Sequence, residues 1–336
     1  MTERARLTSP SSQPPSEQQM NAEAQIAPSD TVMSRFLARW SFPVTMVGLT
    51  GIGIVAMERG YSPLMMLTVL SIASFLIVIV LEQINPHSAY WERPQGDVVT
   101  DLLHMLISGA LIPPATGVVW RVLMAGWAAS LSAALGMGLW PDQWPMVAQV
   151  TLALVIAELG QYWWHRLAHE KDFLWRFHST HHSPGRLYFL NTGRFHPIDM
   201  FVAYSTEIVP LVVLGAGADV IALWTLVTTI HGLFQHANTK ANIGWLNWVF
   251  SMAELHRWHH SLEAEKANTN YGANLICWDI IFGTRYLPKD QTHQPDDVGI
   301  GDLPDFPKGY LEQLAVPFRW RKTKKESAGE LQQTTS

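Results

Sequence analysis

Cysteine and charged residues are both scarce in this chain of 336 residues. The one cysteine, Cys277, excludes an internal disulfide framework and any metal site built from cysteines. Asp, Glu, Lys and Arg make up 15% of the residues, well below the level of about a quarter that is typical of soluble domains. The net charge is only −5, and the sequence has no basic patch that would indicate a nucleic-acid partner.

The sequence also lacks the motifs of a built-in redox domain. It has no GxGxxG dinucleotide fingerprint and no cysteine set for an iron–sulfur cluster. Residues 1–33 are rich in Ser, Pro, Gln and Glu, and we expect them to form a disordered tail. The tail has no charged n-region or apolar h-region, so we predict no signal peptide.

Hydrophobic residues, in contrast, make up 48% of the chain, and there are fifteen tryptophans. A spanning helix needs roughly 20 apolar residues, and the runs at 42–57, 63–81 and 145–164 fit that length. The stretch 102–139 is too long for one span and contains Pro113, Pro114 and Arg121, so we expect an interfacial helix followed by one span. The runs at 200–214 and 220–234 are short and predict a hairpin that dips into the bilayer. The predicted fold is an all-α integral membrane bundle of about four spanning helices plus this hairpin.

Arginines near the first apolar run indicate the orientation. Arg35 and Arg39 precede this run, whereas Glu58 and Arg59 cancel in the next loop, so the N-terminus is predicted to be cytoplasmic. If the stretch 102–139 crosses once, residues after Trp164 are also cytoplasmic. Two crossings there would reverse this prediction.

The histidines are the main chemical signal. Eleven of the fourteen fall between His165 and His260, and two clusters share the spacing HxxHH. On a helix, positions i, i+3 and i+4 lie on one face, so each triplet is predicted to point at one place. Imidazole is a common ligand of zinc, iron, copper and nickel, and eight or more such ligands favour two ions. The predicted ligands are His165, His169, His178, His181, His182, His236, His256, His259 and His260.

Three further residues are candidates around these ligands. Glu158 lies two helical turns before His165 on the same face, and we interpret it as a carboxylate that orients a ligating histidine. Asp279 is expected either to fix a ligand or to cap a helix. His196 is favoured over His231 as an extra ligand, since His231 lies on a different helix face from His236. Three histidines outside the pattern are expected to be structural or solvated: His87, His104 and His293.

From Glu158 to Pro288 the chain resembles the fatty acid hydroxylase / sterol desaturase superfamily of membrane di-metal oxygenases. The resemblance rests on motifs in a fixed order. They are YWWHRLAH at 162–169, LWRFHSTHHS at 174–183, RFHP at 194–197, GLFQHAN at 232–238, HRWHHS at 256–261, NYG at 270–272 and WDIIFGT at 278–284. The N-terminal third is similar only as hydrophobic helices.

The resemblance implies a membrane bundle with a cytosolic, histidine-rich helical cap whose histidines hold two irons. Together with composition, it predicts four segments: the disordered tail at 1–33, membrane helices at 34–144, a catalytic domain at 145–290, and the C-terminal segment 291–336. In this last segment the pattern of Phe306, Tyr310, Leu314, Phe318 and Trp320 predicts an interfacial helix within 304–320, followed by a basic tail. Members use dioxygen and external electrons to hydroxylate an unactivated C–H bond of a fatty acyl, sterol or ether lipid. The electron donor would be a separate protein, a ferredoxin or a cytochrome with its reductase. The nine predicted ligands match family ligands by position.

Other functions are compatible with parts of the pattern. A lipid desaturase would use the same metals and the same hydrogen-abstraction step. A metal transporter or sensor would need ligands near the midplane of several spans, where only Glu158 and Glu207 are found. A zinc hydrolase is disfavoured because the two sites consist of histidines with no obvious carboxylate base. HRLAHE is also not the zinc-protease motif, since Arg166 stands where that motif needs glutamate. Zinc could still occupy the sites after purification, because it outcompetes ferrous iron at nitrogen ligands.

Overall fold

The computed structural model describes residues 31–288 and 297–334, and in those ranges the fold is entirely helical. It contains no β-strand there, only three isolated bridges between loops. The predicted all-α class is therefore confirmed. The disordered tail predicted for 1–33 falls, apart from its last residues, outside the described part of the chain, as does His293.

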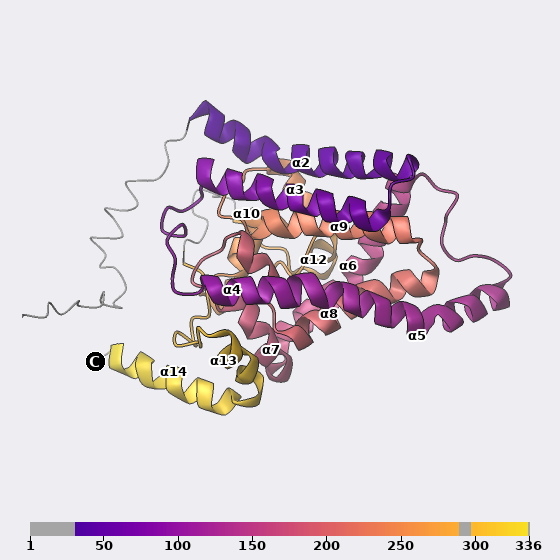
Figure 1. The fold of residues 1–336 in the computed structure, drawn as a ribbon. Helices are drawn as coiled ribbons and strands as arrows, with labels where there is room; N and C mark the ends of the chain where they lie inside the picture. The colour runs from indigo at the N-terminus through magenta and orange to yellow at the C-terminus, as the bar shows by residue number, and fades with distance from the viewer. Residues whose placement is uncertain (1–30, 289–296, 335–336) are drawn as a thin grey trace, which may run out of the picture.

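Six helices are long and apolar enough to cross a membrane, which makes this a multi-pass membrane protein. Figure 1 shows them side by side, running back and forth through the bundle. Their apolar side chains project outward as well as inward, as expected where lipid rather than water surrounds the fold. The six are α2 (Val32–Glu58), α3 (Pro63–Ile84), the continuous stretch Val98–Leu135, α6 (Met146–Glu170), α8 (Pro197–Leu214) and α9 (Ala218–His236).

The predicted hairpin is wrong, because α8 and α9 are both of spanning length. They contain 18 and 19 residues, or about 27 and 28 Å at 1.5 Å per residue. Helix α9 extends beyond its apolar run, because His231, Gln235 and His236 in its last turns are buried inside the protein. Hydropathy counts such polar residues as the end of a span, although the membrane never meets them.

The predicted break within 102–139 is also wrong. Helix α4 (Val98–His104) passes through a π-helical segment, η1 (Met105–Leu111), directly into α5 (Ile112–Leu135). Pro113 and Pro114 cannot donate backbone hydrogen bonds. The wider π turn, in which the Ile112 N–H reaches the carbonyl of Ile107, accommodates them without ending the helix.

Helix α9 forms the centre of the bundle. It packs against α2, α3 and α6, and Leu223, Leu226, Ile230 and Leu233 on it have no exposed surface. Helix α5 is the opposite extreme, because most of its apolar side chains are exposed on the outside of the bundle. The core thus holds α9 in place, and α9 carries His236 at its last residue.

The shorter elements gather at the end of the bundle where α2 begins. Asn242, just after α9, donates to the Ala38 carbonyl, and Ser34 donates to Asn85 at the end of α3. The same end holds α7 (Asp172–His182), η2 (Phe189–Gly193), η3 (Gly244–Trp248), α10 (Ala253–His259) and α11 (Ala264–Ala267), whereas α12 (Cys277–Phe282) packs against α6.

The C-terminal region departs from its prediction. Instead of one helix within 304–320, there are two short turns, α13 (Tyr310–Ala315) and η4 (Val316–Phe318), interrupted by Pro317. The residues predicted to be a basic tail form most of α14 (Trp320–Thr334), seen in yellow at the edge of Figure 1. Proline at 317 and the change of direction at Arg319 explain why one continuous helix does not form.

Candidate metal centre

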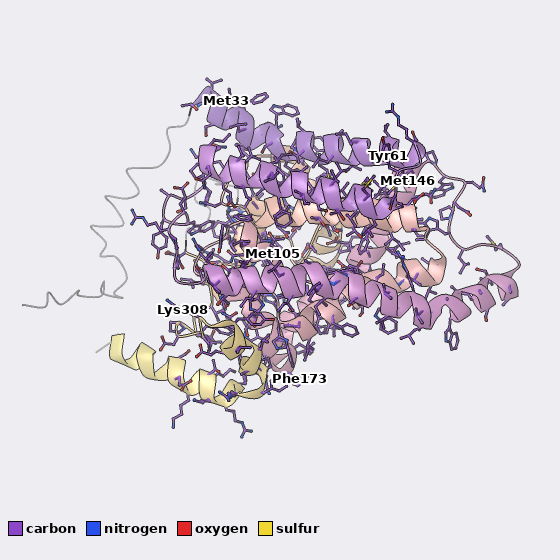
Figure 2. All side chains as sticks on the ribbon, viewed as in Figure 1. Met33, Tyr61, Met105, Met146, Phe173 and Lys308 are labelled. Atoms are coloured by element: carbon purple, nitrogen blue, oxygen red, sulfur yellow. The ribbon has the colours of Figure 1, made fainter. Side chains whose placement is uncertain are left out.

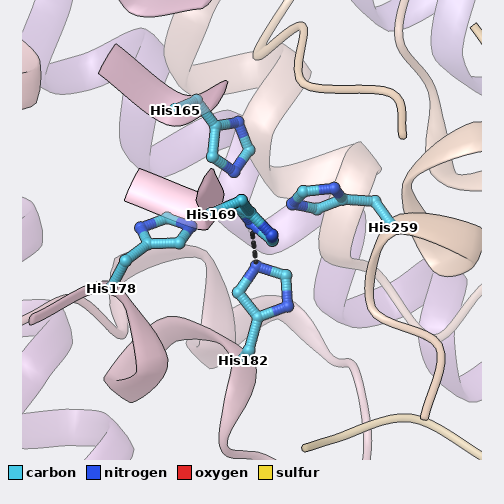
Figure 3. A group of neighbouring side chains, drawn as sticks. All are labelled: His165, His169, His178, His182 and His259. Carbon is cyan, nitrogen blue, oxygen red and sulfur yellow. Dashed lines mark hydrogen bonds between the residues drawn. The ribbon is translucent and has the colours of Figure 1, made fainter. Parts of the chain in front are cut away.

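The nine histidines come together in two adjoining groups at one end of the bundle. Within each group one ring nitrogen of every histidine lies within 4.8 Å of the others. We call these group one and group two. Group one, drawn in Figure 3, is His165, His169, His178, His182 and His259. Group two is His181, His236, His256 and His260.

The two HxxHH triplets exchange roles between the groups. On α7 the first and last histidines, His178 and His182, belong to group one, whereas His181 belongs to group two. On α10 the pattern is reversed, since His256 and His260 join group two. The prediction that each triplet points at one place is therefore wrong. Neighbouring residues on a helix are rotated by about 100°, so the i+3 and i+4 rings separate toward different centres.

In group one the Nδ1 atoms are held from outside. Nδ1 of His165 lies 2.6 Å from the Tyr271 carbonyl, and Nδ1 of His259 lies 2.7 Å from the Thr269 carbonyl. These carbonyls can only accept, so the ring protons are on Nδ1 and the Nε2 atoms carry lone pairs. Nε2 of both rings is buried with no protein partner.

Side chains hold two other rings of group one. Nδ1 of His178 lies 2.9 Å from Oδ2 of Asp199, and Nδ1 of His169 lies 3.1 Å from Oδ1 of Asn268. Asp199, in the first turn of α8, also accepts from the indole of Trp164 on α6 at 2.9 Å. One buried carboxylate therefore joins α6, α7 and α8 behind the group. Neither partner was predicted from the sequence, because nothing in the local sequence connects either residue to a histidine.

Two rings of group two are held in the same way. Nδ1 of His236 lies 3.1 Å from the Gly232 carbonyl, and Nδ1 of His181 lies 3.3 Å from the Arg194 carbonyl. Their Nε2 atoms face each other at 3.4 Å, and Nε2 of His256 lies 3.0 Å from that of His236. His260 completes the set, with its Nε2 2.9 Å from that of His256.

This donor set fits a metal ion. Two imidazoles that both hold their proton on Nδ1 cannot hydrogen-bond through Nε2, and their lone pairs repel unless a cation lies between them. Burial, reinforced by neighbouring imidazoles, also holds the pKa of His181, His182 and His260 well below the ordinary value. The rings are therefore neutral, which is the form that binds metals.

Glu158 and Asp279 lie behind the centre without touching a histidine. Both oxygens of buried Glu158 accept from Asn274, through its backbone N–H and its side-chain amide. Asp279 accepts from the backbone N–H groups of Tyr271 and Gly272, so it fixes the segment whose carbonyl holds His165. Each carboxylate therefore accepts hydrogen bonds from the loop 270–274. Contrary to the prediction for Glu158, neither bonds a histidine ring directly.

The remaining histidines lie outside both groups. His196 is the N-cap of α8, where its Nδ1 accepts from the Ile198 N–H, and its Nε2 faces the Leu314 carbonyl. His231 is buried edge-on against Phe42. His104 is bonded to the Phe195 carbonyl and to Gln313. His87 packs against Trp91 in a loop.

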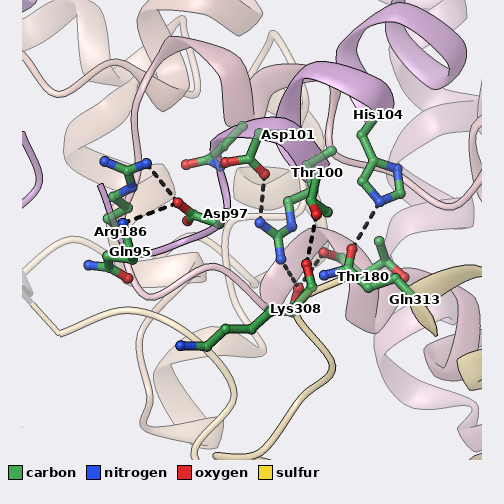
Figure 4. Close-up of polar contacts among 12 residues, drawn as sticks. Gln95, Asp97, Thr100, Asp101, His104, Thr180, Arg186, Lys308 and Gln313 are labelled. Atoms are coloured by element: carbon green, nitrogen blue, oxygen red, sulfur yellow. Dashed lines mark hydrogen bonds and ion pairs between the residues drawn. The ribbon is translucent and has the colours of Figure 1, made fainter. Parts of the chain in front are cut away.

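A buried ionic network beside the start of α4 supports group two (Figure 4). Asp101 on α4 accepts from Arg194 at 2.6 Å and from the Tyr188 hydroxyl at 2.7 Å. Arg186 pairs with Asp97 at 2.8 Å in the same region. Buried ions need such partners, and here the pairing fixes Arg194, whose carbonyl holds His181.

Two cavities open at this end of the bundle. One, of about 480 Å³, is lined by His169, His182, Trp175 and Asn268 among others, so it reaches group one directly. The other, of about 330 Å³, is lined by Arg194 and Lys308 and by none of the nine histidines. His169 is the one group member with appreciable exposure.

The fold and donor set define a class: a multi-pass membrane protein with two adjoining histidine sites suited to metal ions. The fatty acid hydroxylase family model matches residues 150–284. Ornithine lipid hydroxylase OlsE of Rhizobium tropici is 40% identical over 288 residues, covering 85% of each chain. Because of this similarity over nearly the whole length, the chain belongs to the fatty acid hydroxylase family and is an oxidoreductase.

Two more distant relatives match over less than half of the chain. Human alkylglycerol monooxygenase is 30% identical over 145 residues, which cover 43% of this chain and 31% of that enzyme. The Xenopus tropicalis enzyme of the same name is 28% identical over 140 residues, again with 31% of its length covered. No solved structure matches this chain.

Proposed function

We propose that this protein is a di-iron lipid hydroxylase whose substrate is an ornithine lipid or a closely related amino-acid-containing lipid. The similarity to the Rhizobium tropici enzyme supports the substrate class, because it includes the membrane helices as well as the histidine region. The observation that carries the proposal is the convergence of nine Nε2-directed imidazoles on two adjoining centres. Lipid enters such a site from the bilayer, in which the six helices are embedded.

We assign one iron to each group. His165, His169, His178, His182 and His259 would hold the first, and His181, His236, His256 and His260 the second. Bound iron supplies an oxidant for an unactivated C–H bond, which no side chain can provide. Zinc would occupy the same nitrogen ligands after aerobic purification. We place the catalytic domain at 145–290, after the membrane helices of 34–144 and before the C-terminal segment 291–336.

The protein's own residues position and protect the chemistry. The carbonyls of Tyr271 and Thr269 and the carboxylate of Asp199 keep the Nε2 atoms directed inward. Burial of group two keeps water from its centre. Of the two cavities, only the one beside His169 and His182 leads from outside to a histidine group. We propose that dioxygen reaches the metal centre through it.

The orientation follows from the arginines and the helix count. The histidine groups and the start of α2 lie at the same end of the bundle. Arg35 and Arg39 at that end favour the cytoplasm by the positive-inside rule. We therefore propose a cytoplasmic metal centre, where a separate soluble electron donor can reach it.

Anaerobic purification followed by turnover tests the proposal. Iron and zinc per chain are measured, and the protein then receives reductant, dioxygen and either ornithine lipid or a phospholipid control. We expect two irons per chain and ornithine lipid that gains one oxygen atom by mass spectrometry. Loss of two hydrogens instead would identify a desaturase, which uses the same hydrogen-abstraction step. Zinc that iron cannot replace, with no oxygen-dependent product, would contradict an oxidative function.

A further inference from the structure

Trp175 forms an aromatic contact between group one and the C-terminal region. Its ring centroid lies 5.0 Å from that of His169, 5.4 Å from that of His182 and 6.2 Å from that of His178. It projects from α7 one turn before His178. The indole therefore contacts three rings of group one and connects them to residues outside that group.

On its other side, Trp175 packs against an apolar cluster that includes Trp320. Trp320 opens α14 and is buried, and its indole N–H donates to Asp172 at 3.1 Å. Lys324, one turn later, bonds the same carboxylate at 3.0 Å and lies 5.0 Å above the Trp320 ring. The cluster consists of Ile300, Leu303, Phe306, Val316 and Trp320.

The outer side of α14 is basic. Its inner stripe, Trp320, Thr323 and Ser327, is buried and follows the i, i+3, i+7 spacing of a packed helix face. The exposed side chains around it form what we call the basic surface. The basic surface consists of Arg319, Arg321, Lys322, Lys324 and Lys325.

The basic surface has the composition of a protein-binding face and not of a membrane anchor. Within 320–328 the apolar residues are Trp320, which is buried, and Ala328, and the exposed Phe318 lies just before this stretch. A helix that lies in the interface needs a large apolar face beside its basic one. Lys322 pairs with Glu326 and Lys324 with Asp172, but the five cations still leave a net positive charge. The field of this charge in water steers acidic proteins toward it.

We propose that the basic surface binds a small acidic electron-transfer protein, and that Trp175 shortens the electron path from that partner to group one. This inference rests on the proposed function. Hydroxylation of R–H by dioxygen yields R–OH and water and consumes two electrons and two protons. The reduced partner supplies the two electrons one at a time and is oxidised, while the protons come from solvent.

Binding of an acidic [2Fe–2S] ferredoxin to the detergent-solubilised protein tests the docking surface. Charge reversal at the rim of an interface chiefly slows association and changes its salt dependence, so Lys325→Glu is expected to weaken ferredoxin binding by about threefold to tenfold at low salt. Arg59→Glu is the matched control. It makes the same charge change at an exposed residue at the end of α2, two positions before Tyr61, which Figure 2 labels at the opposite end of the bundle from Lys308. Equal affinities for the two variants would refute the docking surface and leave anionic lipid headgroups as the partner.

Reduction kinetics test the role of Trp175. In Trp175→Leu, reduction of the metal centre by ferredoxin should slow by at least tenfold, on the order of a 1.4 kcal/mol rise in the barrier. Ferredoxin affinity and metal content should stay unchanged, reduction by dithionite should slow much less, and Trp175→Phe should recover part of the rate. Equal slowing with both reductants, or loss of metal, would mean that Trp175 only shapes the site.

These readouts separate this inference from the proposed function. Oxygenated lipid formed with dithionite shows the hydroxylase whether or not ferredoxin binds. Ferredoxin binding that depends on Lys325 supports the basic surface even in metal-free protein. A negative result for ferredoxin binding therefore does not affect the interpretation of lipid oxygenation, and the reverse also holds.

Discussion

The two histidine groups use the same ring atoms but differ in enclosure. Group one has five histidines, includes the partly exposed His169, and borders a cavity of about 480 Å³. Group two has four, all buried, and neither of the two cavities at this end of the bundle is lined by any of them. Group one can therefore meet molecules from outside, whereas group two is held within the protein.

The two groups also differ in what bonds the Nδ1 atoms of their histidines. Group one is held partly by side chains, Asp199 and Asn268, as well as by carbonyls. The Nδ1 contacts of group two that are made, those of His181 and His236, go to carbonyls. Side-chain supports can be removed by a single substitution, so the comparison can be tested at group one without moving the backbone.

Removal of one ligand from each group should give the largest effects. His165→Ala and His181→Ala are each expected to lower product formation by more than about 100-fold, beyond the range seen for outer-shell partners. Each should also lose one metal ion per chain, since the groups have separate ligands. Membrane insertion should persist, because neither residue contributes to the apolar surface of the bundle.

Elemental analysis of metal per chain and lipid mass spectrometry measure both results. His87→Ala is the control, since His87 lies outside both groups. Full activity in either variant would contradict the assignment of a catalytic metal ion to that histidine group. Loss of both ions from one variant would mean that the groups do not fill independently.

Asp199→Asn should have an intermediate effect confined to group one. The carboxylate accepts from His178 through one oxygen and from Trp164 through the other. An amide has only one oxygen, so one donor loses its partner, and the negative charge behind His178 disappears. Metal affinity of group one should fall about 10- to 100-fold, while group two stays filled.

Metal titration of the variant against Asp219→Asn measures this fall. Asp219 is exposed in the first turn of α9. An equal fall in metal affinity in group one and group two would show that Asp199 stabilises both groups together and does not orient the His178 ring alone.

Asn268→Ala should have the smallest effect. Asn268 faces Nδ1 of His169, the group-one ring with appreciable exposure, and both line the open cavity. Water can replace the lost hydrogen bond at nearly the same enthalpy, so metal affinity should fall by less than about tenfold, below the usual range for such partners. A fall as large as that of Asp199→Asn would mean that water does not reach this side of group one.

Much of the candidate site could be predicted from the sequence, because histidine spacing on a helix is a local property. All nine predicted ligands lie in the two groups. Their division between the groups could not be predicted. His181 and His182 are adjacent in sequence but point to different centres, and the direction of each depends on where α6, α9 and α10 meet α7.

The groups that bond Nδ1 of the histidines could not be predicted from the sequence, for a different reason. The partner of His165 is a backbone carbonyl 106 residues away, and a carbonyl leaves no trace in residue type. In the fold, the spans were predictable from hydropathy except in two places. In the last turns of α9, burial by protein replaces burial by lipid. In 98–135, a π-helical segment just before Pro113 and Pro114 keeps the helix continuous.

The arrangement of ligands has a consequence for how the chain is fastened together. Group two takes residues from α7, α9 and α10, between positions 181 and 260, and group one links α6 and α7 to α10. With one cysteine, the chain has no internal disulfide to tie these segments. Two bound ions would act as cross-links in their place. They would tie His181 to His236, 55 positions later, and His165 to His259, 94 positions later, and so add to the hydrogen bonds and ion pairs that already hold these segments.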